Sequence, residues 1–369
     1  MRLVFFVHSL VSDWNHGNAH FLRGVVRELV ARGHAVRVYE PEDAWSRDNL
    51  VRGHGERPLR EFTRAFPELS SKVYGRKLDV DEAVDGADAV LVHEWNAPWL
   101  VRAVGASRAV ALFHDTHHRA VTAPDEMRRY DLSGYAGVLA FGARIAEVYR
   151  ERGWHDRAWV WHEAADTPLF RPLRRKKTGD VVWIGNWGDG ERTNELNRFL
   201  FWPVRRLGLT GTVHGVRYPE RGRRALKRAG LEYRGWLANH RAPEAFARHR
   251  VTVHVPRRPY VRALPGIPTI RPFEALACGI PLVSAPWEDT EGLFSAGEDF
   301  LVARNGREMQ DALREVLADP KLAQALARRG RRTILARHTC AHRVDELLAI
   351  LRSLGVRNLK RVPSAEAAA

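Results

Sequence analysis

The chain contains little cysteine, little lysine and no long run of apolar residues. Its 369 residues include two cysteines, Cys278 and Cys340, which lie far apart and outside any CxxC motif. Two such cysteines supply neither a disulfide framework nor a zinc site. The apolar run near the start, Leu3 to Val7, is much shorter than the roughly 18 residues that a membrane span needs. We therefore expect neither a disulfide scaffold nor a membrane-spanning helix.

The start of the sequence does not resemble a secretion signal. Met1-Arg2 leads directly into five apolar residues and then His8, with no longer apolar region or cleavage site behind them. We therefore expect a cytoplasmic protein.

Basic residues outnumber acidic ones, but they are spread along the chain. There are 59 lysines and arginines against 44 aspartates and glutamates, a net charge of +15, and only 7 of the 59 are lysine. The densest clusters are Arg171 to Lys177, Arg221 to Arg228 and Arg328 to Arg332. This scatter favours solvated helix faces and a basic linker over a nucleic-acid site. A surface that attracts phosphates or anionic lipid head groups stays open, so peripheral contact with the inner face of a membrane is an alternative.

The order of apolar runs predicts two α/β domains, each built on a doubly wound parallel sheet. Short apolar strands alternate with helical stretches, which is typical of parallel sheets. The expected strands of the first series are residues 1–7, 35–39, 89–92, 109–113, 137–141 and 158–161. Those of the second series are residues 181–184, 211–214, 231–233, 251–255, 280–283 and 300–302.

The segment Glu163 to Lys177, with two prolines and a run of charges, has the composition of a linker. We expect a first domain over residues 1–172, a second over 173–319, C-terminal helices over 320–354 and a disordered tail over 362–369. Two such domains would place the carboxyl ends of both sheets at a common cleft, where open α/β sheets bind ligands.

The most specific segment is Ile267 to Val302, which begins IPTIRPFEALACGIPLVS. We expect a helix that starts near Arg271, carries Glu274 in its first turn and ends at Cys278-Gly279. A helix start attracts a diphosphate, and a carboxylate there can accept hydrogen bonds from ribose hydroxyls. Glu274 could also do no more than complement the helix dipole.

The motif RPFEALACGIPLVS resembles the corresponding segment of the CgeB-like glycosyltransferases, the spore maturation type, which are relatives of the group 1 glycosyltransferases. The resemblance extends to IGNWGDGERTNEL at Ile184 to Leu196, to HEAADTPLFRP at His162 to Pro172, and in all to about Arg352. It implies a GT-B fold, with two Rossmann-like domains, and transfer of a hexose or related sugar from a nucleotide-sugar donor to a hydroxyl acceptor. It also implies that the last helix, near His342 to Leu354, crosses back onto the first domain.

The resemblance assigns donor-side roles to three residues of the second domain. Glu274 would hold the donor ribose, Arg271 would face the donor phosphates or sugar, and Glu291 would lie near the nucleotide. Many retaining relatives have a further glutamate eight positions before the helix glutamate, and this sequence has Gly266 there. Retention and inversion of the sugar's configuration therefore both stay open.

A glycine-rich loop follows the first strand of the second domain. It comprises Gly185, Asn186 and Trp187 with two further glycines, and Arg192 follows it. Glycines let the backbone approach a ligand, and an arginine can supply the positive charge that a metal otherwise provides. We expect these four residues to bind the donor, although glycine also serves tight turns for purely geometric reasons.

In the first domain, polar residues follow several expected strands. His114 and Asp115 are the candidate catalytic pair, because histidine can move a proton near neutral pH. The candidate residues for the acceptor or the cleft are Gly17, Asn18, His20 and Glu94. Hydrogen bonding within loops is the alternative for the histidines, and helix capping is the alternative for Glu94.

No metal or other cofactor is expected. The histidines at 114, 117 and 118 lack a further ligand at fixed spacing. Asp79-Val80-Asp81 matches a DxD metal motif but precedes a short helix, so capping explains it better. Helix dipoles and arginines can stabilise the leaving diphosphate instead.

We predict a metal-independent glycosyltransferase whose acceptor is a glycan, lipid or protein hydroxyl. Three alternatives stay open. The first is a catalytically silent relative that binds carbohydrate, which the glycine at position 266 would suit. The second is a nucleotide-sugar epimerase, and the third, which the charge supports only weakly, is a nucleic-acid-binding protein.

Overall fold

A computed structural model describes residues 1–356, and they form two compact units. Unit 1 comprises Met1–His162 together with the C-terminal segment from Cys340, and unit 2 comprises Glu163–Thr339. The division after His162 differs from the predicted boundary after Pro172, because the chain from Glu163 onward already packs in unit 2. The predicted C-terminal helices are also divided between the units. The expected disordered tail, 362–369, lies outside the described residues.

Unit 1 is built on a seven-stranded, entirely parallel sheet with strand order β3-β2-β1-β4-β5-β6-β7. Its strands are β1 (Arg2–Phe6), β2 (Ala35–Pro41), β3 (Lys72–Tyr74), β4 (Ala89–His93), β5 (Val110–Asp115), β6 (Gly137–Ala140) and β7 (Ala158–Val160). β4 is buried along its whole length, as expected for a strand covered on both faces. The order reverses between β1 and β4, which makes this the switch point of a doubly wound sheet.

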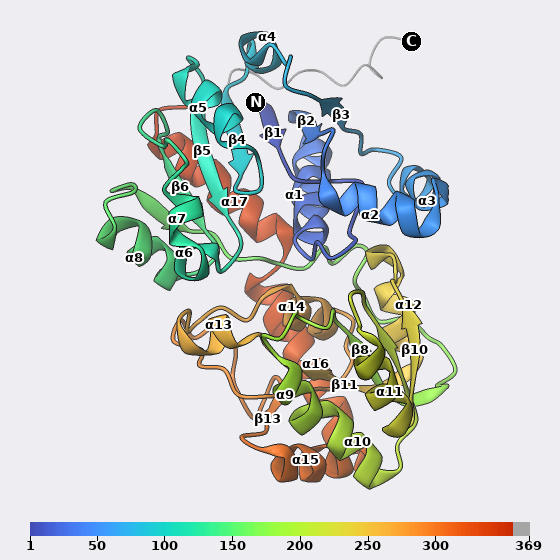
Figure 1. The fold of residues 1–369 in the computed structure, drawn as a ribbon. Helices are drawn as coiled ribbons and strands as arrows, with labels where there is room; N and C mark the ends of the chain where they lie inside the picture. Colours follow the sequence, from blue (N-terminus) through green and yellow to red (C-terminus); the bar gives the residue numbers. More distant parts are fainter. Residues whose placement is uncertain (357–369) are drawn as a thin grey trace, which may run out of the picture. The chain divides into compact units, whose positions relative to one another are not determined.

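Nine helices accompany this sheet among the described residues. They are α1 (Ala19–Ala31), α2 (Trp45–His54), α3 (Arg57–Ala65), α4 (Val80–Val84), α5 (Pro98–Ala106), α6 (Arg119–Thr122), α7 (Pro124–Met127), α8 (Ala143–Glu151) and α17 (Cys340–Ser353). The terminal helix α17 lies beside α1 within unit 1 (Figure 1). The indole nitrogen of Trp161 donates to the carbonyl of Arg343 at 2.8 Å, and Arg32 pairs with Asp345. These contacts tie α17 to the sheet and to α1.

Unit 2 has a six-stranded parallel sheet with strand order β10-β9-β8-β11-β12-β13. Its strands are β8 (Gly179–Ile184), β9 (Gly211–His214), β10 (Leu231–Gly235), β11 (His249–His254), β12 (Leu282–Ser284) and β13 (Leu301–Val302). The order reverses between β8 and β11, so this sheet is doubly wound too.

The helical segments of unit 2 surround this sheet (Figure 1). They are α9 (Thr193–Leu196), the π-helical turn η1 (Asn197–Phe201), α10 (Trp202–Leu207), α11 (Glu220–Arg228), the 3₁₀ turn η2 (Asn239–Arg241), α12 (Ala242–Ala247), α13 (Arg258–Arg262), α14 (Ile270–Ala277), α15 (Gly306–Ala318) and α16 (Pro320–Arg337). Helix α14 begins at Ile270, so Glu274 lies in its second turn rather than in the first turn, as the sequence suggested.

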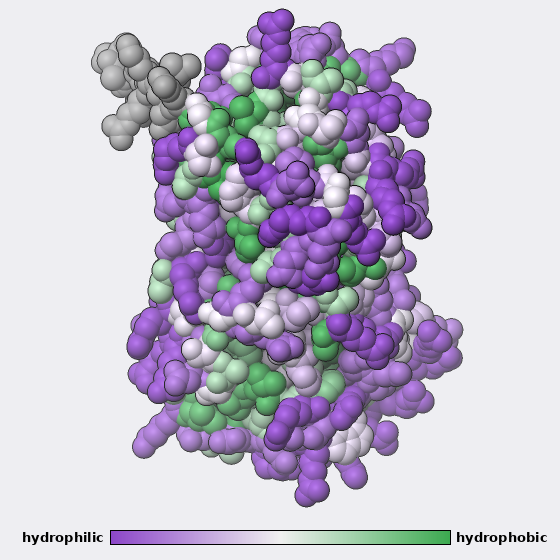
Figure 2. Space-filling model, turned by 90° about the vertical axis from the view of Figure 1, so that its left-hand side faces the viewer, coloured by the Kyte–Doolittle hydropathy of each residue, from purple (hydrophilic) through white to green (hydrophobic). Residues whose placement is uncertain are grey.

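The surface is dominated by polar side chains. On the face drawn in Figure 2, hydrophilic residues prevail and apolar ones form small patches. The arginines of α11, for example, lie on an exposed helix face, and Arg224 pairs there with Glu220. None of the helices between residues 1 and 356 is long and apolar enough to cross a membrane.

Candidate functional site

The glycine-rich loop of unit 2 connects β8 to α9 and passes through left-handed backbone conformations. Gly188 and Gly190 have φ angles of 85° and 93°, and Asp189 between them has φ 49°. Two of these positions need glycine, because other residues rarely adopt such angles. The carbonyl of Gly185 accepts hydrogen bonds from the Trp183 indole and the Tyr218 hydroxyl at 3.0 and 2.9 Å. These two hydrogen bonds therefore hold the first part of the loop in place.

Arg192 lies under this loop and forms no ion pair with a carboxylate among the described residues. Its guanidinium donates to the carbonyls of Asn186 at 2.6 Å and Val255 at 3.1 Å, and it lies over the ring of Trp183. Its Nε atom is buried without a hydrogen-bond partner, and among the described residues no carboxylate pairs with it. A guanidinium held by neutral carbonyls keeps its full positive charge available to an anion.

Further arginines surround Arg192. Burial, followed by repulsion from Arg257 and Arg271, lowers the pKa of Arg192 to about 9, so it remains protonated at neutral pH. Arg257 pairs with Glu191 at 2.9 Å. Because Arg192 follows β8 and Arg257 follows β11, this cluster lies at the switch point of the sheet, the usual ligand site of an open α/β fold.

Glu274 projects from α14 into the same region and is completely buried. One carboxylate oxygen accepts from the side-chain amide of Asn239 at 2.6 Å, and the other pairs with Arg271. The predicted donor residues Glu274 and Arg271 thus form a hydrogen-bonded pair. The residue before the helix, Thr269, has φ 60°, which is a strained angle for a β-branched residue.

Glu291 packs against the glycine at position 266. A Cβ atom placed on Gly266 would lie 2.8 Å from the Glu291 carboxylate and 2.7 Å from the Thr290 hydroxyl, and Gly266 has φ 87°. A side chain at this position would therefore have to displace those of Thr290 and Glu291, and the positive φ would strain any residue other than glycine. The Glu291 carboxylate, which comes from a different loop, lies beside Gly266.

One predicted donor residue takes another role. Trp187 is 4% exposed and belongs to the apolar core of unit 2, where it packs on Tyr218, Phe201 and the backbone of Gly222. We therefore assign Trp187 a packing role instead of the predicted contact with the donor. Asn186 stays in the loop, where its side-chain oxygen accepts from the Val216 amide at 2.8 Å.

In unit 1, the predicted catalytic pair is buried at the end of β5. His114 is 2% exposed and lies against Trp161, His93 and Phe21, with ring centroids 4.8, 5.6 and 5.9 Å away. Burial lowers its pKa to about 3. A group so weakly basic and so enclosed is poorly placed to take a proton from an acceptor, so the geometry does not support His114 as a general base.

Asp115 is also fully buried, and both of its oxygens are engaged. The Tyr149 hydroxyl donates to one at 2.8 Å and the His117 amide to the other at 3.1 Å. Burial raises the pKa of Asp115 to about 6, although these donors favour the ionised form. Asp115 thus holds the loop after β5 in place.

Glu94, at the end of β4, holds the same loop. It accepts hydrogen bonds from the amide and hydroxyl of Thr116 and lies 3.5 Å from Arg119. Burial, together with the nearby Asp115, raises the pKa of Glu94 well above its usual value. Glu94 therefore links two neighbouring loops rather than capping the helix that follows it.

The loop between β1 and α1 contains the remaining acceptor candidates. Gly17 is exposed, whereas Asn18 and His20 are buried at the start of α1. Two residues that the sequence analysis did not select hold this loop: Glu40 accepts from the amides of Leu10 and Val11, and Arg23 donates to their carbonyls. Both are charged residues next to apolar residues that the sequence predicts to be buried, which is a signal that could have identified them.

No metal cluster is found in the part of the chain that the structure describes. The Asp79 side chain accepts from the Glu82 amide at 3.0 Å and caps α4, as expected for the DxD sequence.

Comparison with known proteins agrees with this geometry. Residues 169–349 match the family model described as "Glycosyl transferase-like". This segment of the chain therefore resembles a glycosyltransferase domain. Its α14 and glycine-rich loop both lie within the matched residues. A comparison with curated protein sequences found no match.

Solved glycosyltransferase structures share the whole fold. Sucrose-phosphate synthase from Thermosynechococcus elongatus superposes with a TM-score of 0.65 and 15% identity, covering 96% of this chain and 99% of that one. Anabaena HepE in complex with UDP-glucose gives 0.66 and 13%, covering 96% and 100%. The T4 phage glucosyltransferase BGT with UDP-glucose gives 0.63 and 13%, covering 96% and 99%. The predicted GT-B fold is thereby confirmed.

Proposed function

We propose that this glycosyltransferase moves a hexose or related sugar from a nucleotide diphosphate to a hydroxyl acceptor, that it needs no metal ion, and that it is closest in type to the CgeB-like enzymes. In the reaction, the bond between the anomeric carbon and the diphosphate oxygen breaks, and a bond to the acceptor oxygen forms. The acceptor loses its proton and the diphosphate leaves as an anion. A protein that stabilises this anion accelerates the reaction.

The single observation that carries the proposal is Arg192 at the switch point of unit 2. Its charge has no carboxylate partner among the described residues, and two further guanidiniums repel it. Binding a diphosphate would relieve this repulsion and form charge-assisted hydrogen bonds, which are the strong ones. The same charge would stabilise the leaving group without a metal ion.

The donor ribose is proposed to bind at Glu274, with Arg271 directed to the phosphates. The Asn239 amide and the Arg271 guanidinium hold the Glu274 carboxylate. Ribose hydroxyls would share these oxygens or replace Asn239 as the donor. Glu291 is proposed to lie near the nucleotide, next to Gly266.

The acceptor is proposed to bind on unit 1, at the carboxyl edge of its sheet. Of the four sequence candidates, Gly17 is exposed and can contact an acceptor directly. Asn18, His20 and Glu94 are buried, so we propose that they position the loops around it. We also propose a cytoplasmic location, where the buried Cys278 and Cys340, neither in a disulfide, stay reduced.

The test is calorimetric titration of the full-length chain with UDP and UDP-glucose, the ligands of several structural neighbours. Arg192→Ala should weaken UDP binding by about 10- to 150-fold, from hydrogen bonds to a charged group worth about 1.5–3 kcal/mol. Arg224→Ala, which removes the same charge from the exposed face of α11, is the matched control and should bind UDP normally.

Equal UDP affinities for the two variants, with unchanged melting temperatures, would contradict the proposed donor site. Consumption of UDP-glucose should proceed in EDTA. Loss of that activity in EDTA and its recovery with manganese would overturn the metal-independent mechanism.

A further inference from the structure

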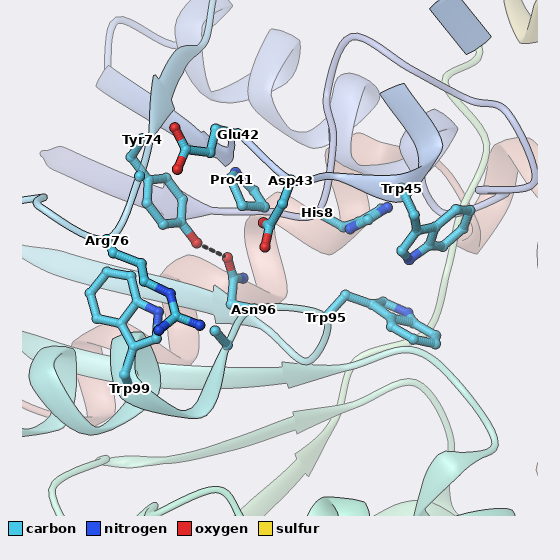
Figure 3. A pocket seen from close by; sticks show the side chains of 12 residues that line it. His8, Pro41, Glu42, Asp43, Trp45, Tyr74, Arg76, Trp95, Asn96 and Trp99 are labelled. Carbon is cyan, nitrogen blue, oxygen red and sulfur yellow. Dashed lines mark hydrogen bonds between the residues drawn. The ribbon is translucent and has the colours of Figure 1, made fainter. Parts of the chain in front are cut away.

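A pocket of about 350 Å³ opens on unit 1 where β2, β3 and β4 end (Figure 3). A volume of this size suits a small ligand, since such pockets span about 300–1,000 Å³. It lies beside the switch point of this sheet, since His8 follows β1 and Trp95 follows β4. The lining residues are His8, Pro41, Glu42, Asp43, Trp45, Tyr74, Gly75, Arg76, Trp95, Asn96, Ala97 and Trp99.

Aromatic rings form much of this lining. Trp45, Trp95 and Trp99 are each only half-buried. The rings of Trp45 and Trp95 lie 6.0 Å apart and nearly perpendicular, and Trp99 lies 6.2 Å from the ring of Tyr74. Three tryptophans held partly open to solvent in one pocket offer flat apolar surface to a ligand.

Three charged side chains border the same pocket without partners. Glu42, Asp43 and Arg76 are exposed and form no side-chain hydrogen bond or ion pair with any of residues 1–356. By contrast, the Asp13 carboxylate is paired with Arg23 at 2.9 Å. The three side chains are therefore available to a ligand that offers hydroxyl groups.

The base of the pocket is rigid. The side-chain amide of Asn96 donates to the carbonyls of Phe6 and His93 at 2.9 and 2.7 Å, and its oxygen accepts from the Tyr74 hydroxyl at 2.7 Å (Figure 3). Burial lowers the pKa of His8 to about 3, so this wall is uncharged. A pre-formed pocket loses little freedom when it binds a ligand.

We propose that this pocket binds a sugar ring of the acceptor, and specifically a saccharide without phosphate or carboxylate groups. This proposal rests on the proposed glycosyl transfer and names the chemical class of its acceptor. The C–H faces of a pyranose pack on the indole rings, while the carboxylates accept hydrogen bonds from its hydroxyls and the guanidinium donates to them. The two carboxylates of Glu42 and Asp43 and the one guanidinium of Arg76 give the pocket a net negative charge, so it repels a phosphate or a uronate.

The experiment measures saccharide binding to the full-length chain by saturation-transfer NMR. The probes are the methyl glycosides of glucose, galactose, mannose, N-acetylglucosamine and glucuronic acid. At least one neutral glycoside should bind the wild type, and the glucuronide should bind at least tenfold more weakly. Trp99→Ala and the double variant Glu42→Gln/Asp43→Asn should each weaken the neutral glycoside at least tenfold.

Trp202→Ala removes a more exposed tryptophan from α10 in unit 2 and should leave saccharide binding unchanged. The double variant keeps the apolar lining, so it tests the pocket even if Trp99→Ala unfolds. Titration of the same samples with UDP separates the two proposals. Normal UDP affinity with no saccharide binding refutes the acceptor pocket alone, whereas saccharide binding without UDP binding refutes the donor site alone.

Two other results would also overturn the proposal. One is equal binding of the glucuronide and the neutral glycosides. The other is tighter binding of a short single-stranded oligonucleotide that Trp99→Ala abolishes, since the aromatic lining would then stack bases rather than sugars.

Discussion

Replacing Asp115 by Asn separates a structural from a catalytic role for the buried carboxylate at the end of β5. The carboxylate has a pKa of about 6 in the folded chain, raised by burial, against 3.8 without that burial. Between these two values the folded chain binds a proton that the unfolded chain has lost. Stability contributed by this group is therefore present at low pH and is lost as the pH rises through 6.

The size of the effect follows from the two pKa values. For values of 3.8 and about 6, the group favours the folded state by on the order of 2 kcal/mol more at pH 4.5 than at pH 7.5, and it shares this effect with the neighbouring Glu94, whose pKa burial and the Asp115 charge both raise. An asparagine side chain does not titrate, so the variant should lose this pH dependence. Asn keeps an oxygen to accept one of the two hydrogen bonds, and Tyr149 can accept from its amide, so we expect a folded variant.

The assay is hydrogen exchange of the β5 amides, which measures the local difference in stability between variant and wild type at each pH. Comparing the two proteins at the same pH cancels the intrinsic pH dependence of exchange. Asp131→Asn is the matched control: Asp131 is largely exposed, and hydrogen bonds from Ser133 lower its pKa, so its contribution changes only at lower pH. A difference between Asp115→Asn and wild type that stays constant from pH 4.5 to 7.5 would refute the reasoning. Loss of single-turnover transfer at every pH, with normal UDP affinity and stability, would restore Asp115 to a catalytic role.

Two further predictions concern unit 2. Gly266→Ala should destabilise the loop before α14 and weaken UDP binding, because the new Cβ would crowd Glu291 and Thr290. Gly292→Ala is the control, since Gly292 has a φ angle of 62° but open space around it. Equal UDP affinities in the two variants would contradict this account. Trp187→Ala should lower the free energy of unfolding of unit 2 by about 3–5 kcal/mol in denaturant titrations followed by β8 hydrogen exchange. A nearly unchanged stability with a large loss of UDP affinity would show that Trp187 contacts the donor after all.

Most strands could be predicted because parallel strands are apolar along their whole length. The run at β4 is an example, since all five of its residues are buried. β3 was missed because it has three residues, two of them exposed, and only Tyr74 faces the interior. The helix that became α14 was predicted one residue short, which was enough to place Glu274 in the wrong turn.

The candidate site could be predicted only where its residues follow each other in the sequence. The glycine-rich loop and Arg192 are contiguous, so their association was visible. The burial of His114 depends on Trp161 and Phe21, which come from distant parts of the chain. The burial of Trp187 likewise depends on the space that Gly222 leaves. No local sequence pattern predicts such packing between distant residues.

The proposed ligands of the two units differ in charge, and the local charges of each unit suit this difference although the whole chain has a net charge of +15. In unit 2, the guanidiniums at the switch point would attract a diphosphate, and none of the described carboxylates forms an ion pair with Arg192. In unit 1, the pocket presents two unpaired carboxylates against one guanidinium. Like charges repel, and at an exposed site solvent weakens this repulsion without abolishing it. A phosphate that entered the unit 1 pocket would meet that repulsion, whereas a neutral sugar would not. We therefore propose that local charge at each switch point, rather than the total charge of the chain, selects the ligand of each unit.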